Sequence, residues 1–355
     1  MKRIAYIEID THAEIAQSFM EIMKGSEAFS VDYYFSKKIK DQITDNAESV
    51  YLSDSSMISD QLKSRKYDLV IIGTAHRYFN TFSAIAEKYN TAVIAHNINF
   101  ISASNFTLFK SIFKKDSIYR LKLLWKEGLL YSSKIYGKAK SLLVLDEALS
   151  SEPFRFLPLF YTKQLVKADG DILTIVIPGG VSQKRRDYEK VFSEIKKIEQ
   201  LYTDSDIQKK LIEFVFLGKA DHAELKKLTD LERSLQYVDI TYFPERVSQA
   251  DFEQWMEKAD VLWCPIQQET EFFSQKEIYG RTKMTGNIGD AIKFGKLAVF
   301  PENYRSSLDF IIPQQPDLIR QFEKLRDLHF NFQKDYSKQA VRQNLEDLLN
   351  SLSST

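Results

Sequence analysis

The sequence predicts an α/β protein built from two doubly wound parallel-sheet domains that face each other across a cleft. Short apolar runs alternate with amphipathic helical patterns, which is typical of βαβ units. The same alternation restarts after residue 170, and 355 residues exceed the usual size of one domain. A hydrophobic fraction of 44%, with only 12 Gly and 8 Pro, excludes a disordered or low-complexity chain.

The first predicted domain covers residues 1–165. Its strands are short apolar runs closed by Gly or polar residues, and its helices repeat apolar residues with helical spacing. We expect strands at 4–9, 29–35, 50–52, 67–73, 91–95 and 141–145, and helices at 13–23, 55–65 and 79–89.

The second predicted domain covers residues 166–333 and follows a polar linker at 163–170. The same criteria predict strands at 171–177, 212–218, 238–243, 261–264 and 297–300, and helices at 188–202, 223–235, 249–258 and 286–294. The helical pattern at 334–352 makes residues 334–355 a C-terminal helix that can cross back to the first domain. Both domains are then Rossmann-like, and ligands bind beyond the carboxyl ends of such strands.

Charge and cysteine content exclude several classes of protein. The 49 basic and 49 acidic residues give a formal charge of zero, which disfavours a nucleic-acid binder. The single cysteine, Cys264, excludes an internal disulfide or a Cys-rich zinc site and suits a reducing compartment. The N-terminus is not a signal peptide and no apolar run is long enough to span a membrane, so we expect a cytoplasmic protein.

Four segments of the second half carry recognisable patterns. They are a strand with a glycine turn and basic loop, a strand ending in Gly, a strand and turn followed by an Ala-Asp-strand-Pro segment, and a helix with an acidic residue followed by Gly and a strand. In chain order they occupy residues 176–188, 214–218, 238–265 and 285–299. This ordered set resembles the nucleotide-sugar-binding domain of GT-B glycosyltransferases, most closely the retaining family typified by bacterial lipopolysaccharide and capsule glycosyltransferases.

The resemblance covers residues 171–300, and the first half is similar by architecture only. It implies transfer of a sugar from a nucleotide-diphosphate donor, such as a UDP- or GDP-sugar, to a saccharide or lipid-linked acceptor in the synthesis of cell-surface polysaccharide or another glycan. It also implies that no metal ion is needed, because cationic side chains can neutralise the diphosphate. Two alternatives stay open: a non-catalytic subunit that binds glycan or a partner glycosyltransferase, and a nucleotide-sugar epimerase.

The predicted diphosphate site has two parts. Gly179 and Gly180 let the backbone approach a phosphate, and Arg186 supplies positive charge. The alternative for the basic loop is a solvated charge run before a helix. The second part lies near the start of the helix at 286–294 and consists of Lys283, Thr285 and Gly286. The alternative here is an ordinary capped helix.

The same resemblance suggests residues for the rest of the donor. Asp290 would hold the ribose, whereas the family commonly has two glutamates eight residues apart and this chain has Thr282 and Asp290 at those positions. That departure leaves the donor-sugar contact to nearby residues, for which we predict Glu277 and Tyr279. The nucleobase would rest near Pro244, Glu245 and Arg246.

Three histidines follow strands of the first half, at the edge where ligands are expected. His12, with Asp10, follows the first strand and could act as general base toward the acceptor hydroxyl. The predicted acceptor residues follow two later strands and are His76, Arg77, His96 and Asn97. The alternative is that these are polar loop residues. A metal site is disfavoured, because no histidine pair has metal-ligand spacing.

Residues 110–140 combine nine Lys and Arg with two acidic residues and many large apolar side chains. This composition is typical of a helix that lies on a membrane surface, and it predicts peripheral contact with the inner face of the cell membrane. The alternative is a helix packed on the core with a solvated basic face. The segment also shows that the zero net charge is a sum of opposite local charges.

Overall fold

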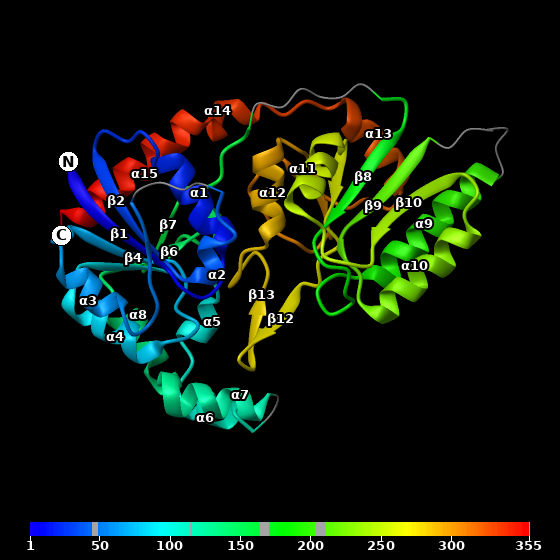
Figure 1. Cartoon of the computed structure of the whole chain (residues 1–355). Coiled ribbons are helices and arrows are strands. Elements are labelled where there is room, and N and C mark those ends of the chain that lie inside the picture. The colour runs from blue at the N-terminus through cyan, green and yellow to red at the C-terminus, as the bar shows by residue number, and fades with distance from the viewer. Residues whose placement is uncertain (45–48, 114–115, 164–169, 204–210, 355) are drawn as a thin grey trace. The chain divides into compact units, whose positions relative to one another are not determined.

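The computed structural model describes residues 1–44, 49–113, 116–163, 170–203 and 211–354 (Figure 1). Most of the predicted linker at 163–170, as well as Lys114 and Lys115, lie outside the described residues. The chain divides into two compact units. Unit 1 comprises Met1–Phe160, Glu271–Met284 and Lys338–Thr355, and unit 2 comprises Tyr161–Thr270 and Thr285–Ser337.

Unit 1 contains a seven-stranded parallel sheet with the order β3-β2-β1-β4-β5-β6-β7. The strands are β1 (Lys2–Glu8), β2 (Phe29–Phe35), β3 (Val50–Leu52), β4 (Leu69–Ile72), β5 (Thr91–Ile94), β6 (Ser141–Val144) and β7 (Phe154–Phe156). The sequence predicted the first six strands, and β7 is an additional edge strand. Its sequence is Phe-Arg-Phe, so the central Arg155 interrupts the apolar run by which the other strands were recognised.

The helices of unit 1 cover the sheet because strand residues alternate between its two faces. Tyr6 of β1 packs on Phe19, with ring centroids 4.6 Å apart, whereas Ala5 and Ile7 join the core cluster that contains Phe79. The α-helices are α1 (Ala13–Met23), α2 (Lys37–Lys40), α3 (Ile58–Lys63), α4 (Phe79–Lys88), α5 (Ile98–Ile101), α6 (Asn105–Ser111), α7 (Ser117–Lys122), α8 (Ser132–Lys138) and α15 (Lys338–Ser353).

The segment between α5 and β6 is a series of short helices. A π-helical turn, Leu123–Glu127, continues α7 and ends at Gly128, whose φ of 75° lies in the left-handed region. That φ suits glycine and ends the helix there. Within the described part of the chain, no helix is long and apolar enough to cross a membrane.

Unit 2 contains a six-stranded parallel sheet with the order β10-β9-β8-β11-β14-β15. The strands are β8 (Leu173–Pro178), β9 (Ile212–Lys219), β10 (Val238–Phe243), β11 (Val261–Trp263), β14 (Ala298–Phe300) and β15 (Ile311–Pro313). The helices are α9 (Tyr188–Thr203), α10 (His222–Ser234), α11 (Gln249–Lys258), α12 (Gly286–Phe294), α13 (Leu318–Asp327) and α14 (Phe332–Tyr336). The predicted α/β class with two doubly wound sheets is confirmed.

A hairpin leaves unit 2 after β11 and its residues from 271 to 284 pack with unit 1. It consists of β12 (Glu269–Phe272) and β13 (Gln275–Ile278).

The C-terminal helical pattern is interrupted, because α14 ends before Ser337, whose backbone is extended, and α15 begins at Lys338. The carbonyl of Tyr336 accepts a hydrogen bond from the Thr162 N–H, so it does not continue the helix.

Each sheet reverses its strand order once. In unit 1 the reversal falls between β1 and β4, and in unit 2 between β8 and β11. At such a point the loops after the two strands diverge and leave a crevice at their carboxyl ends. Candidate sites are therefore expected after β1 and β4, and after β8 and β11.

Candidate functional site

The first cluster lies at the carboxyl end of β8 in unit 2. Gly179 follows β8 with a φ of 103°, and a Cβ added there would lie 2.3 Å from Nη2 of Arg186. Only glycine therefore lets the guanidinium lie against this turn. Gly218, near the end of β9, packs on the same turn, since its added Cβ would lie 2.5 Å from the Gly179 carbonyl.

Arg186 connects this turn to α12. Its Nη1 donates to the carbonyl of Gly180 at 3.3 Å, and its Nη2 donates to Oδ1 of Asn287 at 3.2 Å. Its buried Nε has no hydrogen-bond partner among the described residues. Nη1 and Nη2 each carry a second N–H that these two bonds do not use, so the guanidinium retains donor capacity.

The N-terminus of α12 forms the other side of the cluster. Thr285 is the N-cap, and its Oγ1 accepts from the N–H of Asn287 at 3.4 Å. Nδ2 of Asn287 donates to the Pro178 carbonyl at 3.2 Å and to Oδ2 of Asp290 at 3.3 Å. Gly286 is exposed, and nothing lies within 4 Å of an added Cβ. Basic charge, open backbone and a helix N-terminus together make an anion site.

Unit 2 therefore gathers most of the predicted donor residues: Gly179, Gly180, Arg186, Thr285, Gly286 and Asp290. The sequence reasoning missed Asn287, which joins both halves of this cluster. The available signal was an asparagine in the first turn of the helix predicted at 286–294. Pro244, Glu245 and Arg246 follow β10 and are exposed, with Glu245 3.4 Å from Nζ of Lys219. Their role toward a nucleobase stays a prediction.

The second cluster lies at the carboxyl ends of β1, β4 and β5 in unit 1 and holds three imidazoles. The His12 and His96 rings stack at 4.1 Å, and the His76 ring lies edge-on to His96 at 5.5 Å. His12 has a φ of 55°, and its Nδ1 is 2.9 Å from Oε1 of Glu14. Glu14 is thus the carboxylate that orients His12, whereas the Asp10 carboxylate lies 3.7 Å from Arg77.

The other two histidines are held in defined tautomers. Nε2 of His96 lies 2.8 Å from the carbonyl of Gly73, which can only accept, so this nitrogen carries the proton. Lys283 donates to Oδ1 of Asn97 at 2.8 Å, and Nδ2 of Asn97 lies 3.2 Å from Nε2 of His76. An amide nitrogen only donates, so Nε2 of His76 accepts.

These environments separate the three imidazoles electrostatically. Burial, with the charges of His12 and Lys283, lowers the pKa of His76 to about 3. Burial also lowers the pKa of His96 well below its ordinary value. Burial acts against protonation of His12 too, but the Glu14 hydrogen bond and charge outweigh it and raise its pKa. His12 is therefore the basic member of the cluster.

Glu8 of β1 holds the loop that carries His12 in place, and the sequence analysis did not single it out. This fully buried carboxylate accepts from the N–H groups of Asp10 and Thr11 at 3.1 and 3.2 Å, and from the Thr74 hydroxyl at 2.6 Å. It thereby fixes the loop that carries His12. Burial raises the pKa of Glu8 to about 7, although the hydrogen bonds from Thr74, Asp10 and Thr11 oppose the shift. An acidic residue inside an otherwise apolar strand was the sequence signal.

The remaining predicted residues have partners within unit 1. Arg77 makes a two-point ion pair with Glu127, at 2.6 and 3.1 Å. Glu277 is fully buried, and its oxygens accept from the N–H groups of Asn99 and Phe100 at 3.3 and 2.9 Å. Tyr279 lies near Lys283, whose Nζ is 5.9 Å from its ring centroid.

Lys283 and Glu277 thus lie with the imidazole cluster of unit 1, whereas Thr285 and Asp290 lie in unit 2. The predicted roles of Lys283 toward the diphosphate and of Glu277 and Tyr279 toward the donor sugar stay predictions. Among the described residues, no group of His, Cys, Asp and Glu side chains has the geometry to hold a metal ion.

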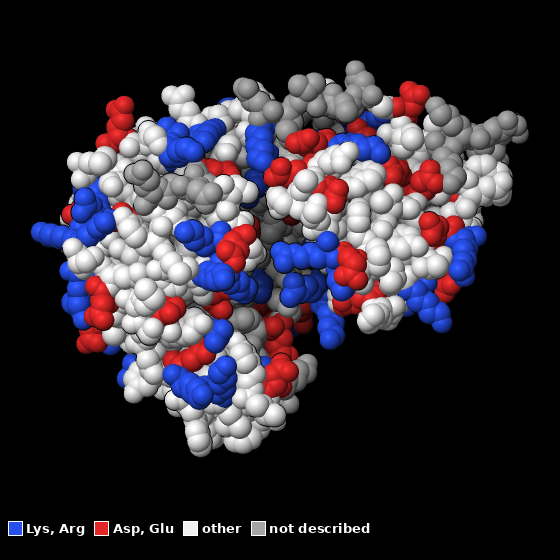
Figure 2. Space-filling model, in the orientation of Figure 1, with Lys and Arg blue, Asp and Glu red and all other residues white. Residues whose placement is uncertain are grey.

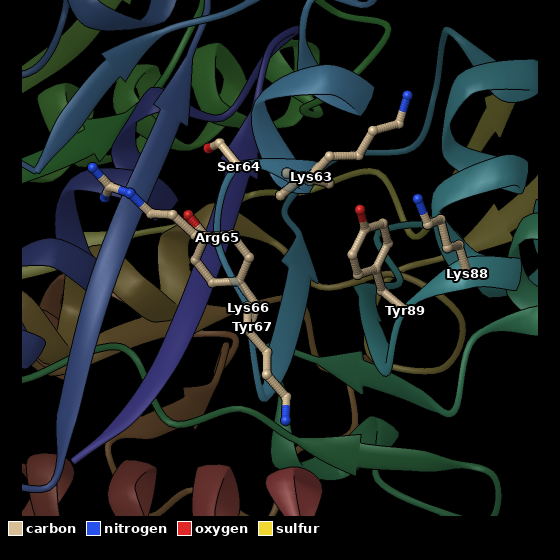
Figure 3. Close-up of a pocket in the computed structure, with 8 residues that line it drawn as sticks. Lys63, Ser64, Arg65, Lys66, Tyr67, Lys88 and Tyr89 are labelled. Atoms are coloured by element: carbon tan, nitrogen blue, oxygen red, sulfur yellow. The ribbon is translucent and has the colours of Figure 1, made fainter.

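A pocket of about 510 Å³ lies away from both clusters (Figure 3). Its lining comes from the ends of α3 and α4 and from the segment before β4, and it includes Arg65, Tyr67 and Tyr89. These residues lie at the amino ends of β4 and β5, opposite the histidines. The guanidinium of Arg65 already has an acidic partner, since its Nη1 pairs with Oδ2 of Asp32 at 2.8 Å. The pocket is therefore not part of the candidate site.

Comparisons with solved structures identify the architecture. The chain is similar to the catalytic domain of starch synthase IV from Arabidopsis thaliana bound to ADP and acarbose, with a TM-score of 0.56, 8% identity and full coverage of both chains. It is similar to a glycosyltransferase involved in avilamycin A biosynthesis, with a TM-score of 0.55, 10% identity and coverage of 100% and 98%. It is also similar to the UDP-GlcNAc 2-epimerase from Neisseria meningitidis, with a TM-score of 0.55, 11% identity and coverage of 99% and 100%.

These similarities establish the GT-B fold, as the sequence resemblance predicted. The sequence itself matches no protein-family model and no curated protein.

Proposed function

We propose that this protein is a glycosyltransferase that moves a sugar from a nucleotide-diphosphate donor to a saccharide or lipid-linked acceptor during synthesis of cell-surface polysaccharide or another glycan. The observation that carries the proposal is the cluster of Arg186, Asn287 and the α12 N-terminus at the strand-order reversal of a GT-B unit. Such a site matches the chemistry of a diphosphate, which needs N–H donors and positive charge.

The donor would bind unit 2 in a defined orientation. The diphosphate would lie over Gly179, Gly180 and Gly286, where the backbone is accessible, with Arg186 neutralising its charge. Asp290, one turn into α12, would accept from the ribose hydroxyls. Pro244, Glu245 and Arg246, which follow β10, would flank the nucleobase.

The transfer itself makes one bond and breaks one. The acceptor oxygen bonds to the anomeric carbon, while the bond from that carbon to the diphosphate oxygen breaks and the diphosphate leaves with both electrons. In an inverting reaction, the acceptor proton would pass to His12, whose pKa Glu14 raises. A retaining reaction does not need that base, because the leaving diphosphate can take the proton. Charge on Arg186 would take the place of a metal ion.

Calorimetric titration with UDP and GDP tests the donor site. Arg186→Ala should lower affinity roughly tenfold to a hundredfold, because a charged hydrogen bond to phosphate is lost. Arg185→Ala is the matched control, since this neighbouring arginine is exposed and should bind nucleotide normally. Lack of binding to either nucleotide, or equal affinity in the Arg186 variant, would contradict the proposal. Binding without turnover across a panel of donor sugars would favour a non-catalytic subunit.

A nucleotide-sugar epimerase is the second candidate. The similarity in fold to the Neisseria meningitidis UDP-GlcNAc 2-epimerase favours it over other classes. An epimerase would use the same diphosphate site but would need no acceptor. Incubation with UDP-sugars alone, followed by analysis of the sugar products, tests this candidate: an epimerised nucleotide sugar supports it, and an unchanged one contradicts it.

A further inference from the structure

Helix α6 and the residues after it are apolar on two faces. The side chains of Leu108 and Ile112 are fully buried in the core of unit 1. On the other face, Phe106, Phe109 and Phe113 are 67%, 46% and 71% exposed. Their spacing of three and then four residues places them on one side of the helix. Packing of unit 1 therefore accounts for the first set and leaves the aromatic set unexplained.

Helix α7 and the π-helical turn repeat this arrangement. Leu123 is fully buried, and Arg120 is bound to the hydroxyl of Ser274 at 2.7 Å. Ile118, Leu121 and Trp125 have the same three-and-four spacing and are 85%, 41% and 83% exposed. We call the six exposed residues the apolar patch: Phe106, Phe109, Phe113, Ile118, Leu121 and Trp125.

The density of the apolar patch is unusual for this chain. Elsewhere, large apolar residues such as Met57, Leu201 and Leu328 are exposed singly on separate elements, which is normal for a protein surface. Six on α6, α7 and the residues that directly follow each helix form the kind of exposed surface that marks an interaction site. Figure 2 shows mostly uncharged surface at the end of unit 1 where Figure 1 places α6 and α7, with basic and acidic side chains beside it.

The charges around the apolar patch indicate which class of partner it would bind. Lys110, Lys122 and Lys126 are exposed on the same helices, and Nζ of Lys110 lies 4.4 Å from the Phe106 ring centroid. Of the two acidic residues in the described part of this segment, Asp116 is exposed and Glu127 is buried in its ion pair with Arg77. Apolar side chains flanked by lysines suit a surface with acyl chains below anionic headgroups.

We propose that the apolar patch docks this protein on an anionic lipid bilayer. The aromatic and aliphatic side chains enter the boundary between headgroups and acyl chains, and the three lysines contact the headgroup phosphates. This inference concerns binding alone and does not depend on the proposed reaction, so failure of either leaves the other testable.

Vesicles of phosphatidylcholine, with and without phosphatidylglycerol, test the docking in the full-length protein. We expect co-sedimentation with the anionic vesicles, reduced by salt, and a blue shift of tryptophan emission that Trp125→Phe abolishes. The other two tryptophans lie outside the apolar patch, because Trp263 is fully buried and Trp255 is a half-buried residue of α11 in unit 2. Quenching of Trp125 by lipids brominated in the acyl chain would place it inside the bilayer. If the wild-type protein binds vesicles of neither composition, the proposal is overturned.

Paired variants separate the apolar and electrostatic parts. Phe113→Ser with Ile118→Ser should lower partitioning about a hundredfold, from the loss of two buried side chains. Leu201→Ser with Leu328→Ser, which removes exposed leucines elsewhere, should leave it unchanged. Lys110→Gln, Lys122→Gln and Lys126→Gln together should lower it roughly a hundredfold. Lys63→Gln, Lys66→Gln and Lys88→Gln, in the pocket of Figure 3, form the charge-matched control.

Two results contradict the assignment. If the control lysines reduce binding as much as the patch lysines, then the bilayer contacts a different surface. A second copy of the chain covers the apolar patch if two results occur together. The wild-type protein does not bind vesicles, and light scattering shows a dimer that is lost in the double variant Phe113→Ser with Ile118→Ser. Circular dichroism of each variant confirms that a lost signal reflects binding and not unfolding.

Discussion

Glu8 shows how one buried residue can set up the imidazole cluster. The carboxylate accepts three hydrogen bonds, two from the loop after β1 and one from Thr74 after β4. It therefore ties together the two loops at the strand-order reversal of unit 1. Gly73 makes room for it, since a Cβ there would lie 2.7 Å from Oε2 of Glu8. The same burial that fixes the carboxylate also disfavours its charge.

The pKa of Glu8 predicts a measurable dependence of stability on pH. Its pKa is about 7 in the folded state and 4.5 in the ordinary reference, so between these values the folded protein binds more protons than the unfolded one. The contribution of Glu8 is then fully present below pH 4.5 and is lost as pH rises through 7. Relative to Glu8→Gln, the wild-type free energy of unfolding should fall by about 3 kcal/mol over that interval.

Urea unfolding of both proteins at a series of pH values checks this difference. Glu87→Gln is a useful control, because the Lys138 hydrogen bond and charge lower the pKa of that exposed carboxyl. Its small contribution has the opposite sign and is lost only as pH falls below the ordinary value. A wild-type minus Glu8→Gln difference that is flat between pH 5 and 8 would show that Glu8 is ionised throughout.

At the scale of elements, the turn after β8 packs against the end of β9 beneath the donor cluster. A Cβ at Gly218 would lie 2.5 Å from both the carbonyl carbon and the oxygen of Gly179. Gly218→Ala should therefore push the β8 turn away from Arg186, destabilise unit 2 by about 1–3 kcal/mol and weaken nucleotide binding. Thermal unfolding and calorimetry measure the two effects.

Gly137 offers the matched control for that substitution. It lies inside α8 with nothing within 4 Å of an added Cβ. Gly137→Ala should leave nucleotide binding unchanged and stabilise unit 1 by roughly 0.5–1 kcal/mol, because glycine is a poor helix former. Normal nucleotide affinity in Gly218→Ala would mean that the turn adapts and that its close packing is not needed for binding.

The hairpin of residues 271–284 depends on Glu277, which accepts hydrogen bonds from the N–H groups of Asn99 and Phe100. Glu277→Ala should leave both donors unsatisfied and cost unit 1 about 2–4 kcal/mol, whereas Glu277→Gln should cost less because its carbonyl still accepts. Glu271→Ala, an exposed residue of the same hairpin, should change stability little. Denaturant unfolding gives these values. Equal effects of Glu277→Ala and Glu271→Ala would show that the hydrogen bonds of Glu277 do not hold the hairpin in place.

The elements that the sequence predicted are those with strong local patterns. Most strands and α12 could be found because apolar runs, a Thr cap and a closing Gly are local signals, and the histidines could be placed because they follow strands. The hairpin could not, because its turn is formed by Phe273 and Ser274 with positive φ and lacks the usual Asn-Gly signature. The contact of Lys283 with Asn97 joins residues 186 positions apart, which no local pattern reveals.

At the scale of the whole molecule, the chain contains two separate hydrophobic cores, one for each sheet and its helices. Proteins with several domains often unfold in more than one step. The candidate nucleotide site lies within unit 2, whereas Glu8 and the imidazoles lie within unit 1. Perturbations of the two sites should therefore affect different unfolding transitions.

Calorimetric melting with and without nucleotide tests this separation. A nucleotide at a hundred times its dissociation constant stabilises the state that binds it by about 2.7 kcal/mol. For a unit of this size, that corresponds to a rise of roughly 5–10 °C in the transition of unit 2, with the transition of unit 1 unmoved. Because its affinity is tenfold to a hundredfold lower, Arg186→Ala should reduce the rise to roughly 1–5 °C at the same nucleotide concentration, and Arg185→Ala should keep it in full. Glu8→Gln should shift only the other transition. A single transition that moves as a whole with nucleotide would show that the two cores unfold as one cooperative unit.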